Sequence, residues 1–165
     1  MHLFLSPHLD DAALSCGGRL FQLANNNEKV TIINIMAGDP PTPLPNTPIV
    51  NDLHQRWQIG ENPVAIRRQE DEKAVKILGV SVEHRKHPDC VYRTHNNQAL
   101  YPDEDALFGA IHPDDHVPKQ LLIEAAMLNF VYVNIESIYV PLGVGHHVDH
   151  QIVRNWGIAL AKRLP

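Results

Sequence analysis

Histidine and carboxylate side chains gather in two short segments that lie far apart in the sequence, each following an apolar run. The first segment contains His8, Asp10 and Asp11, and the second contains His147, Asp149 and His150. Two imidazoles and one carboxylate, with a coordination position left open for water, are the donor set of a mononuclear zinc hydrolase. The two segments therefore predict a catalytic metal centre built from both ends of the chain.

Each segment stands between a predicted strand and a predicted helix. Short apolar runs alternate along the chain with longer stretches of helical character. The predicted strands are Leu3–Leu5, Val30–Met36, Val80–Glu83 and Ser137–Val140. The predicted helices are Ala12–Asn25, Pro63–Leu78, Lys119–Leu128 and Asp149–Arg163. This alternation predicts an α/β fold, a Rossmann-like three-layer sandwich with a mostly parallel sheet, in which ligands gather at the carboxyl ends of the strands.

A proline-rich stretch runs from Gly38 to about Asn62. Its prolines interrupt regular structure, so we predict a long irregular loop. Ordered loops of this length are usually functional. We therefore expect it to form a flap over the metal centre.

The composition restricts the class of protein. With 165 residues and 44% hydrophobic content, the chain is expected to form a single domain, residues 1–165. A net charge of -5 and the lack of a Lys and Arg cluster argue against a nucleic-acid partner. Cys16 and Cys90 have no redox or metal-ligand spacing, so we expect free thiols in a reducing compartment. The sequence shows no leader and no membrane-spanning stretch, so we expect a cytoplasmic protein without a membrane partner.

Three motifs occur in an informative order. They are Ser6-Pro7-His8-Leu9-Asp10-Asp11, Arg67-Arg68-Gln69-Glu70 and His147-Val148-Asp149-His150. Together they resemble the Pro-His-Pro-Asp-Asp-Glu, Arg-x-x-Glu and His-x-Asp-His motifs of the PIG-L (LmbE-like) N-acetylglucosaminyl deacetylase family. The resemblance spans most of the chain. It implies a Rossmann-like sheet, one zinc ion and the removal of acetyl from an acetamido sugar or a related amide.

The resemblance also implies a role for each residue. The implied ligands, for one zinc or another divalent ion per chain, are His8, Asp11 and His150. Asp10 would be the base that activates water, and His147 would stabilise the carbonyl oxygen, with Asp149 orienting it. Attack on an unreactive amide needs a carboxylate that takes the proton of the water. The oxyanion that forms can be stabilised by a protonated imidazole, which we expect His147 to provide.

Three further features leave alternatives open. The resemblance makes Arg67 a candidate substrate contact, although a solvated helix residue would fit the same pattern. Asp89 follows the third predicted strand and is placed either to reach a sugar hydroxyl or to stabilise a turn. The segment 111–116 also contains His-Pro-Asp-Asp, but no strand precedes it. We expect its aspartates to begin the next helix rather than to bind a second metal.

The chain departs from the family pattern in two ways. Leu9 stands where the family usually has Pro, and Ala12 where it usually has Glu, but neither change removes an implied ligand. The chain ends at Pro165, whereas family members normally continue with at least one more strand. We therefore expect Ser137–Val140 to be an exposed sheet edge. Pairing with another chain in a homo-oligomer, or shielding by the last helix, would cover it.

These observations predict a zinc-dependent amide hydrolase whose small-molecule partner is an N-acetylated amino sugar or glycoconjugate. A related amidase that cleaves a larger thiol-sugar conjugate is one alternative. A metal-binding or sugar-binding protein without turnover is another. A nucleotide-binding Rossmann module fits least well, because Gly17 and Gly18 lie within a predicted helix rather than in a Gly-x-Gly-x-x-Gly turn.

Overall fold

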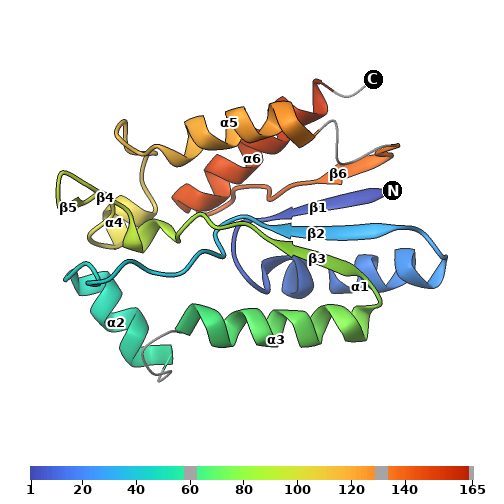
Figure 1. Cartoon of the computed structure of the whole chain (residues 1–165), viewed down its shortest axis with the longest axis horizontal. Coiled ribbons are helices and arrows are strands. Elements are labelled where there is room, and N and C mark those ends of the chain that lie inside the picture. Colours follow the sequence, from blue (N-terminus) through green and yellow to red (C-terminus); the bar gives the residue numbers. More distant parts are fainter. Residues whose placement is uncertain (58–62, 129–133, 164–165) are drawn as a thin grey trace.

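A four-stranded parallel sheet forms the centre of the protein (Figure 1). The computed structural model describes residues 1–57, 63–128 and 134–163. The strands are β1 (His2–Ser6), β2 (Val30–Asn34), β3 (Ser81–His84) and β6 (Ser137–Tyr139). Their order is β3-β2-β1-β6, with β1 paired in parallel to both β2 and β6. The predicted strands and the predicted parallel α/β fold are confirmed, with boundary differences of one or two residues.

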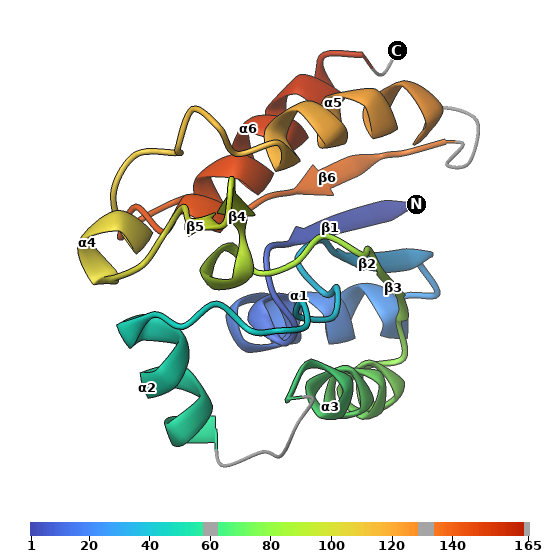
Figure 2. The ribbon, with the colours of Figure 1, turned by 60° about the vertical axis from the view of Figure 1, so that its left-hand side comes forward.

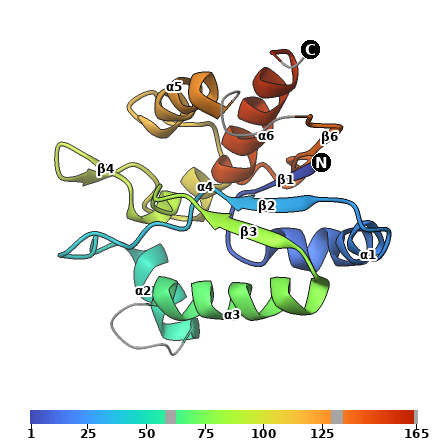
Figure 3. The same cartoon turned by 45° about the vertical axis from the view of Figure 1, so that its right-hand side comes forward.

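Two pairs of helices cover the two faces of the sheet (Figures 1 and 3). The helices α1 (Asp11–Asn25) and α3 (Pro63–Leu78) lie on one face. The helices α5 (Val117–Leu128) and α6 (Val148–Ala161) lie on the other. Because side chains alternate along a strand, β1 contributes to both cores. Phe4 packs with Leu20 and Val75 on the α1 side, while Leu3 and Leu5 join the cluster on the α5 and α6 side.

Smaller elements gather at the carboxyl ends of the strands (Figure 2). They are α2 (Pro48–Trp57), the 3-10 turn η1 (Cys90–Tyr92), β4 (Thr94–His95), β5 (Gln98–Ala99) and α4 (Glu104–Leu107). A separate core holds them together, with Leu9, Val50, Val91 and Tyr101 among its buried members. This layer surrounds the end of the sheet where both His and Asp segments emerge.

The helix α2 corrects the prediction of an irregular loop from Gly38 to Asn62. Proline is compatible with the first turn of a helix, where its missing N–H costs no hydrogen bond. Pro48 occupies that position, and the Thr47 hydroxyl accepts a hydrogen bond from the Val50 N–H at 3.3 Å. The prolines therefore restrict where a helix begins rather than preventing one. Residues 58–62 of the predicted loop lie outside the described residues, so the predicted flap stays a prediction.

The strand β6 forms one edge of the sheet, as predicted. In the described ranges 1–57, 63–128 and 134–163 it pairs with β1 and with no other strand. The helix α6 packs closely over it, because a Cβ on Gly157 would collide with Val140 and lie 3.0 Å from Leu5 Cδ1. The two cysteines are unpaired, as predicted. Within the described part of the chain, no helix is both long enough and apolar enough to cross a membrane.

Candidate metal centre

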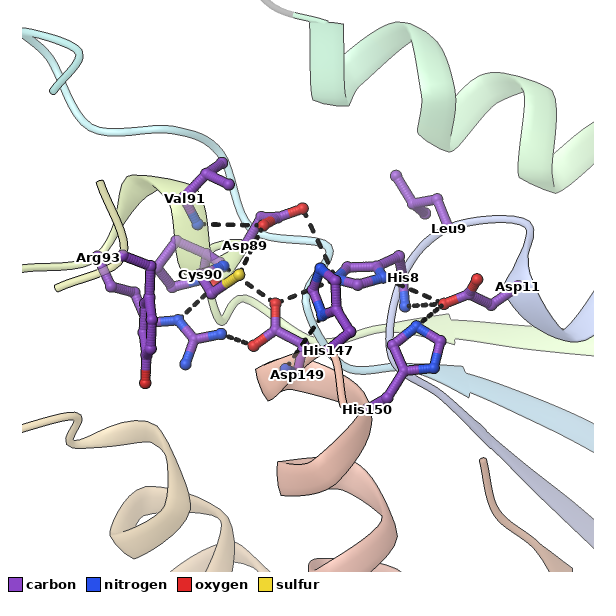
Figure 4. A network of polar contacts seen from close by, with 12 residues as sticks. His8, Leu9, Asp11, Asp89, Cys90, Val91, Arg93, His147, Asp149 and His150 are labelled. Atoms are coloured by element: carbon purple, nitrogen blue, oxygen red, sulfur yellow. Dashed lines mark hydrogen bonds and ion pairs between the residues drawn. The ribbon is translucent and has the colours of Figure 1, made fainter. Parts of the chain in front are cut away.

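His8, Asp11 and His150 come together at the carboxyl end of β1 (Figure 4). Asp11 Oδ2 lies 3.1 Å from His8 Nδ1 and 3.3 Å from His150 Nε2. The ligand atoms of a tetrahedral zinc site with bonds of about 2.0–2.1 Å are separated by about 3.3 Å. The three side chains therefore have both the chemistry and the spacing to hold one divalent ion.

A tight turn after β1 positions His8 and Asp11. The Ser6 hydroxyl donates to the His8 carbonyl at 2.8 Å and accepts from the Ala12 N–H at 3.1 Å. The Asp11 carboxylate also accepts the His8 backbone N–H at 3.0 Å. Ser6 thus links the end of the strand to the first turn of α1, and it fixes the positions of His8 and Asp11 relative to β1.

The second ring nitrogen of His8 is oriented by a buried carboxylate. His8 Nε2 lies 3.0 Å from Asp149 Oδ2, and the Asp149 side chain is 0% exposed. A carboxylate partner keeps the proton on Nε2, which leaves the Nδ1 lone pair for a metal. This arrangement fits a metal-binding histidine held by a carboxylate behind it.

Electrostatics favour a charged Asp11. Burial opposes ionisation of this carboxyl, but hydrogen bonds from His150 and His8 hold its pKa well below the usual range. Burial lowers the pKa of His8, but Asp89 and Asp11 outweigh burial and raise it. The carboxylates around His8 thus give the site a negative electrostatic potential, which favours a bound cation. His150 and Asp11 stay 28% and 29% exposed, so one side remains open to solvent.

A cavity of about 380 Å³ adjoins this open side. Asp11 and His150 form part of its wall, and most of the remaining lining is apolar side chains from β1, α1 and the segment that follows β6. The cavity gives a small molecule access to the side chains of Asp11 and His150.

Asp10 lies beside the donor set rather than within it. Its side chain is 53% exposed, and Arg67 Nη2 lies 3.8 Å from Asp10 Oδ2. Burial raises the pKa of Asp10, opposed by Arg67 and reinforced by the negative charge of Asp11. Asp10 also has a left-handed backbone with φ of 71°. Such a conformation is unusual for a residue other than glycine and must be held by its surroundings.

Asp71, which no sequence motif singled out, supplies that support. Its buried carboxylate accepts the Asp10 N–H at 3.2 Å. The same carboxylate accepts from Asn34 Nδ2 at 2.7 Å and lies 2.8 Å from His84 Nε2. One signal was visible in the sequence, because Asp71 interrupts the apolar face of α3 formed by Val64, Val75 and Leu78.

His147 lies next to the donor set, but its protonation differs from the expectation. Its Nδ1 accepts the Asp149 backbone N–H at 3.3 Å, so the Nε2 of the neutral ring carries the proton. The ring packs against His8 and His150, with centroid distances of 4.9 and 5.2 Å. Burial and the charge of His8 lower the pKa of His147 to about 4. The predicted protonated imidazole is therefore disfavoured, and His147 is a neutral hydrogen-bond donor near pH 7.

Asp149 donates its backbone N–H to His147, while its carboxylate is bonded to His8 Nε2. The carboxylate also accepts the Cys90 N–H at 3.0 Å and forms an ion pair with Arg93. The group His8, His147 and Asp149 has ligand atoms within 4.8 Å of one another. Because Asp149 is already occupied by these partners, the group with Asp11 and His150 is the better metal site.

The structure also places the two predicted substrate contacts. Arg67 Nη2 donates to the Leu9 carbonyl at 3.2 Å, and the guanidinium lies 5.2 Å from the centroid of the Trp57 ring. Asp89 accepts from the Val91 N–H at 3.2 Å and caps η1. Asp89 Oδ2 is also 3.7 Å from His8 Nε2, and although burial raises the pKa of Asp89, His8 and the Val91 N–H lower it overall. Asp89 therefore has the turn role that was one of its two alternatives, and it also faces the centre.

The His-Pro-Asp-Asp segment at 111–116 has a structural role. Asp115 Oδ1 accepts the Val117 N–H at 3.0 Å at the start of α5, as expected. Its other oxygen forms an ion pair with Arg93. In the described part of the chain, no group of potential metal ligands includes a residue of this segment.

Comparisons with known proteins identify a family and similar chains. The family model described as PIG-L, GlcNAc-PI de-N-acetylase, matches residues 3–161. A 2'-N-acetylparomamine deacetylase from Niallia circulans is 30% identical over 96% of this chain and 61% of its own length.

Solved structures of a deacetylase from teicoplanin biosynthesis are also similar. The complex with teicoplanin has a TM-score of 0.78 and 25% identity, over 98% of this chain and 65% of that protein. The zinc-inhibited form of teicoplanin deacetylase has a TM-score of 0.79 and 26% identity, over 98% of this chain and 63% of that protein. The chain thus spans less than two thirds of the length of these relatives.

Proposed function

We propose that this chain, which belongs to the PIG-L family, uses one zinc ion to hydrolyse the amide of an N-acetylated amino sugar. The observation that carries the proposal is the convergence of His8, Asp11 and His150, with Asp10 beside them. The zinc-inhibited deacetylase among the similar structures supports a divalent metal, and zinc suits a donor set of two imidazoles and one carboxylate.

Each side chain near the metal ligands has a distinct proposed role. A bound zinc ion would supply a Lewis acid that polarises the amide carbonyl and lowers the pKa of water to about 7. Asp10 accepts the proton of the attacking water, for which a carboxylate with a raised pKa is well suited. His147 donates from Nε2 to the carbonyl oxygen as negative charge develops there. Asp149 holds both imidazoles, through its carboxylate to His8 and its backbone N–H to His147.

The substrate proposed is an acetamido sugar that is part of a larger natural product. The matched relatives are named for 2'-N-acetylparomamine and for the biosynthesis of teicoplanin. Arg67 lies beside Asp10 and is proposed to contact the substrate. Asp89 is proposed to reach a sugar hydroxyl, although its contacts with Val91 and His8 limit how far it can move.

The test is acetate release from a panel of N-acetylated amino sugars. The panel would contain N-acetylglucosamine, an N-acetylated aminoglycoside fragment, an N-acetylglucosaminyl glycopeptide and a larger thiol-sugar amide. The proposal predicts acetate release from at least one acetylated sugar and none from the chain treated with a chelator. If every acetylated sugar is inert while metal and sugar still bind, the protein is a binder without turnover. Cleavage of the thiol-sugar amide alone would favour the related amidase.

A further inference from the structure

We propose that Arg93 is a positioning residue that holds the metal ligand His8 through Asp149, and that Asp115 anchors Arg93 for this task. The inference deepens the proposed function, because it rests on His8 being a ligand. The sequence did not suggest it, because Arg93 belongs to none of the motifs and Asp115 was expected only to begin the helix that follows segment 111–116.

Arg93 is clamped between two buried carboxylates. Its side chain is 5% exposed, and it forms ion pairs with Asp115 and Asp149, whose side chains are 1% and 0% exposed. Its Nε also donates to the Pro88 carbonyl at 3.2 Å. The planar guanidinium can reach two acceptors at once in a fixed geometry, which a lysine ammonium cannot reproduce.

The anchor at Asp115 is itself fixed. The Tyr101 hydroxyl donates to Asp115 Oδ2 at 2.8 Å, and the Arg93 guanidinium lies 5.7 Å from the Tyr101 ring centroid. The other Asp115 oxygen accepts the Val117 N–H at the start of α5. Asp115 is therefore held by a side chain and by a helix terminus, and it presents a rigid negative charge to Arg93.

Asp149 transmits this constraint to the metal ligand. One of its oxygens faces Arg93, while the other lies 3.0 Å from His8 Nε2 and accepts the Cys90 N–H at 3.0 Å (Figure 4). A fully buried carboxylate remains ionised only when paired and hydrogen-bonded. Arg93 supplies that pairing, so it holds Asp149 in the orientation that His8 requires.

The test compares Arg93→Lys and Asp115→Asn with a control that destabilises the same region without touching the network. Val153→Ala is that control, because Val153 is a buried apolar residue of α6, the helix that carries Asp149 and His150. Thermal unfolding midpoints establish that each variant is folded and show how much stability each one loses relative to the Val153→Ala control. The first readout is the affinity for Zn²⁺ and Co²⁺ measured by chelator competition, with the visible absorption of the Co²⁺-loaded protein reporting ligand geometry.

The second readout needs no metal. In the metal-free protein, the His8 Nε2–H bonded to a buried carboxylate should give a slowly exchanging proton resonance, assigned by its loss in His8→Gln. Arg93→Lys should lose or broaden this resonance, weaken metal binding by about 10-fold or more, and alter the Co²⁺ spectrum. Asp115→Asn should change the same readouts in the same direction by a smaller factor, and Val153→Ala should change neither.

An unchanged His8 resonance and unchanged metal affinity in folded Arg93→Lys would overturn the inference. If Arg93→Lys does not fold, Asp115→Asn decides, and wild-type values in that variant would overturn it equally. Failure of the proposed function looks different. The wild-type chain would then release no acetate or bind no metal, while the effect of Arg93→Lys on the His8 resonance would still be measurable.

Discussion

Replacement of Asp71 by asparagine is expected to impair catalysis from a residue that does not contact the substrate. The Asp71 carboxylate accepts three hydrogen bonds, from the Asp10 N–H, from Asn34 Nδ2 and from His84 Nε2. An asparagine side chain has one oxygen, so its amide nitrogen must face at least one of these donors. The Asp71→Asn protein therefore loses part of the support of the left-handed Asp10 backbone.

The size of the effect follows from the contacts. A hydrogen bond to a charged group contributes about 1.5–3 kcal/mol, and a strained backbone conformation costs about 1–3 kcal/mol. Loss of the bond to the Asp10 N–H is thus comparable with the strain that it offsets. Because about 1.4 kcal/mol corresponds to a factor of ten, loss of this hydrogen bond should lower kcat/KM by roughly 10-fold to 100-fold. The reason is that Asp10 then adopts its catalytic position less often.

The assay is acetate release together with metal content and thermal unfolding. Glu72→Gln is the matched control, because Glu72 is an exposed carboxylate on the same helix and lies outside the Arg67–Glu70 motif. Asp71→Asn should keep the metal, because its carboxylate does not contact His8, Asp11 or His150. A folded Asp71→Asn protein with the wild-type kcat/KM would refute the claim that Asp71 positions Asp10.

Three further outcomes are expected. If Asp10 is the base, Asp10→Asn should retain metal while kcat falls by roughly 10²-fold or more, and a rate equal to wild type would contradict this role. The wild-type kcat/KM should decline as pH falls through a value above the ordinary 3.8, because burial and Asp11 raise the pKa of Asp10. In NMR spectra of the metal-free protein, the His147 ring should remain a neutral imidazole until the pH approaches its pKa of about 4. Titration of this ring near 6.5 would show that burial does not control its pKa. Gly157→Ala should lower the free energy of unfolding by about 1–3 kcal/mol in a denaturant titration, because the added methyl meets Val140 and Leu5, and unchanged stability would show that α6 can move away from β6.

The elements of the sheet could be predicted because their signals are local. The strand β2 is a continuous apolar, β-branched run, as expected of a strand buried on both faces. The convergence of His8, Asp11 and His150 could be predicted from their chemical types, their positions at strand ends and the family motifs that they resemble. The helix α2 was missed because counting prolines ignores that Pro48, after Thr47, is compatible with a helix start.

The supporting network could not be predicted, because it depends on long-range packing. Arg93 and Asp115 meet Asp149 only after η1, α5 and α6 have assembled around the end of the sheet. The protonation of His147 likewise depends on burial and on the neighbouring His8 ring, neither of which a linear motif shows. Ligand types are thus visible in a sequence, whereas the groups that orient them and shift their pKa values emerge from the fold.

Metal analysis and acetate release on the same protein samples test the proposal that His8, Asp11 and His150 hold the catalytic metal. His146→Asn is the control, because His146 is an exposed neighbour with a positive φ of 61°, which asparagine tolerates. We expect about one zinc per chain in the wild type and in His146→Asn, and acetate release that rises with added zinc up to one equivalent. We expect loss of metal and activity in His150→Ala, because two remaining protein ligands rarely hold a hydrolytic metal. Full metal occupancy in folded His150→Ala would contradict the ligand assignment on which the account rests.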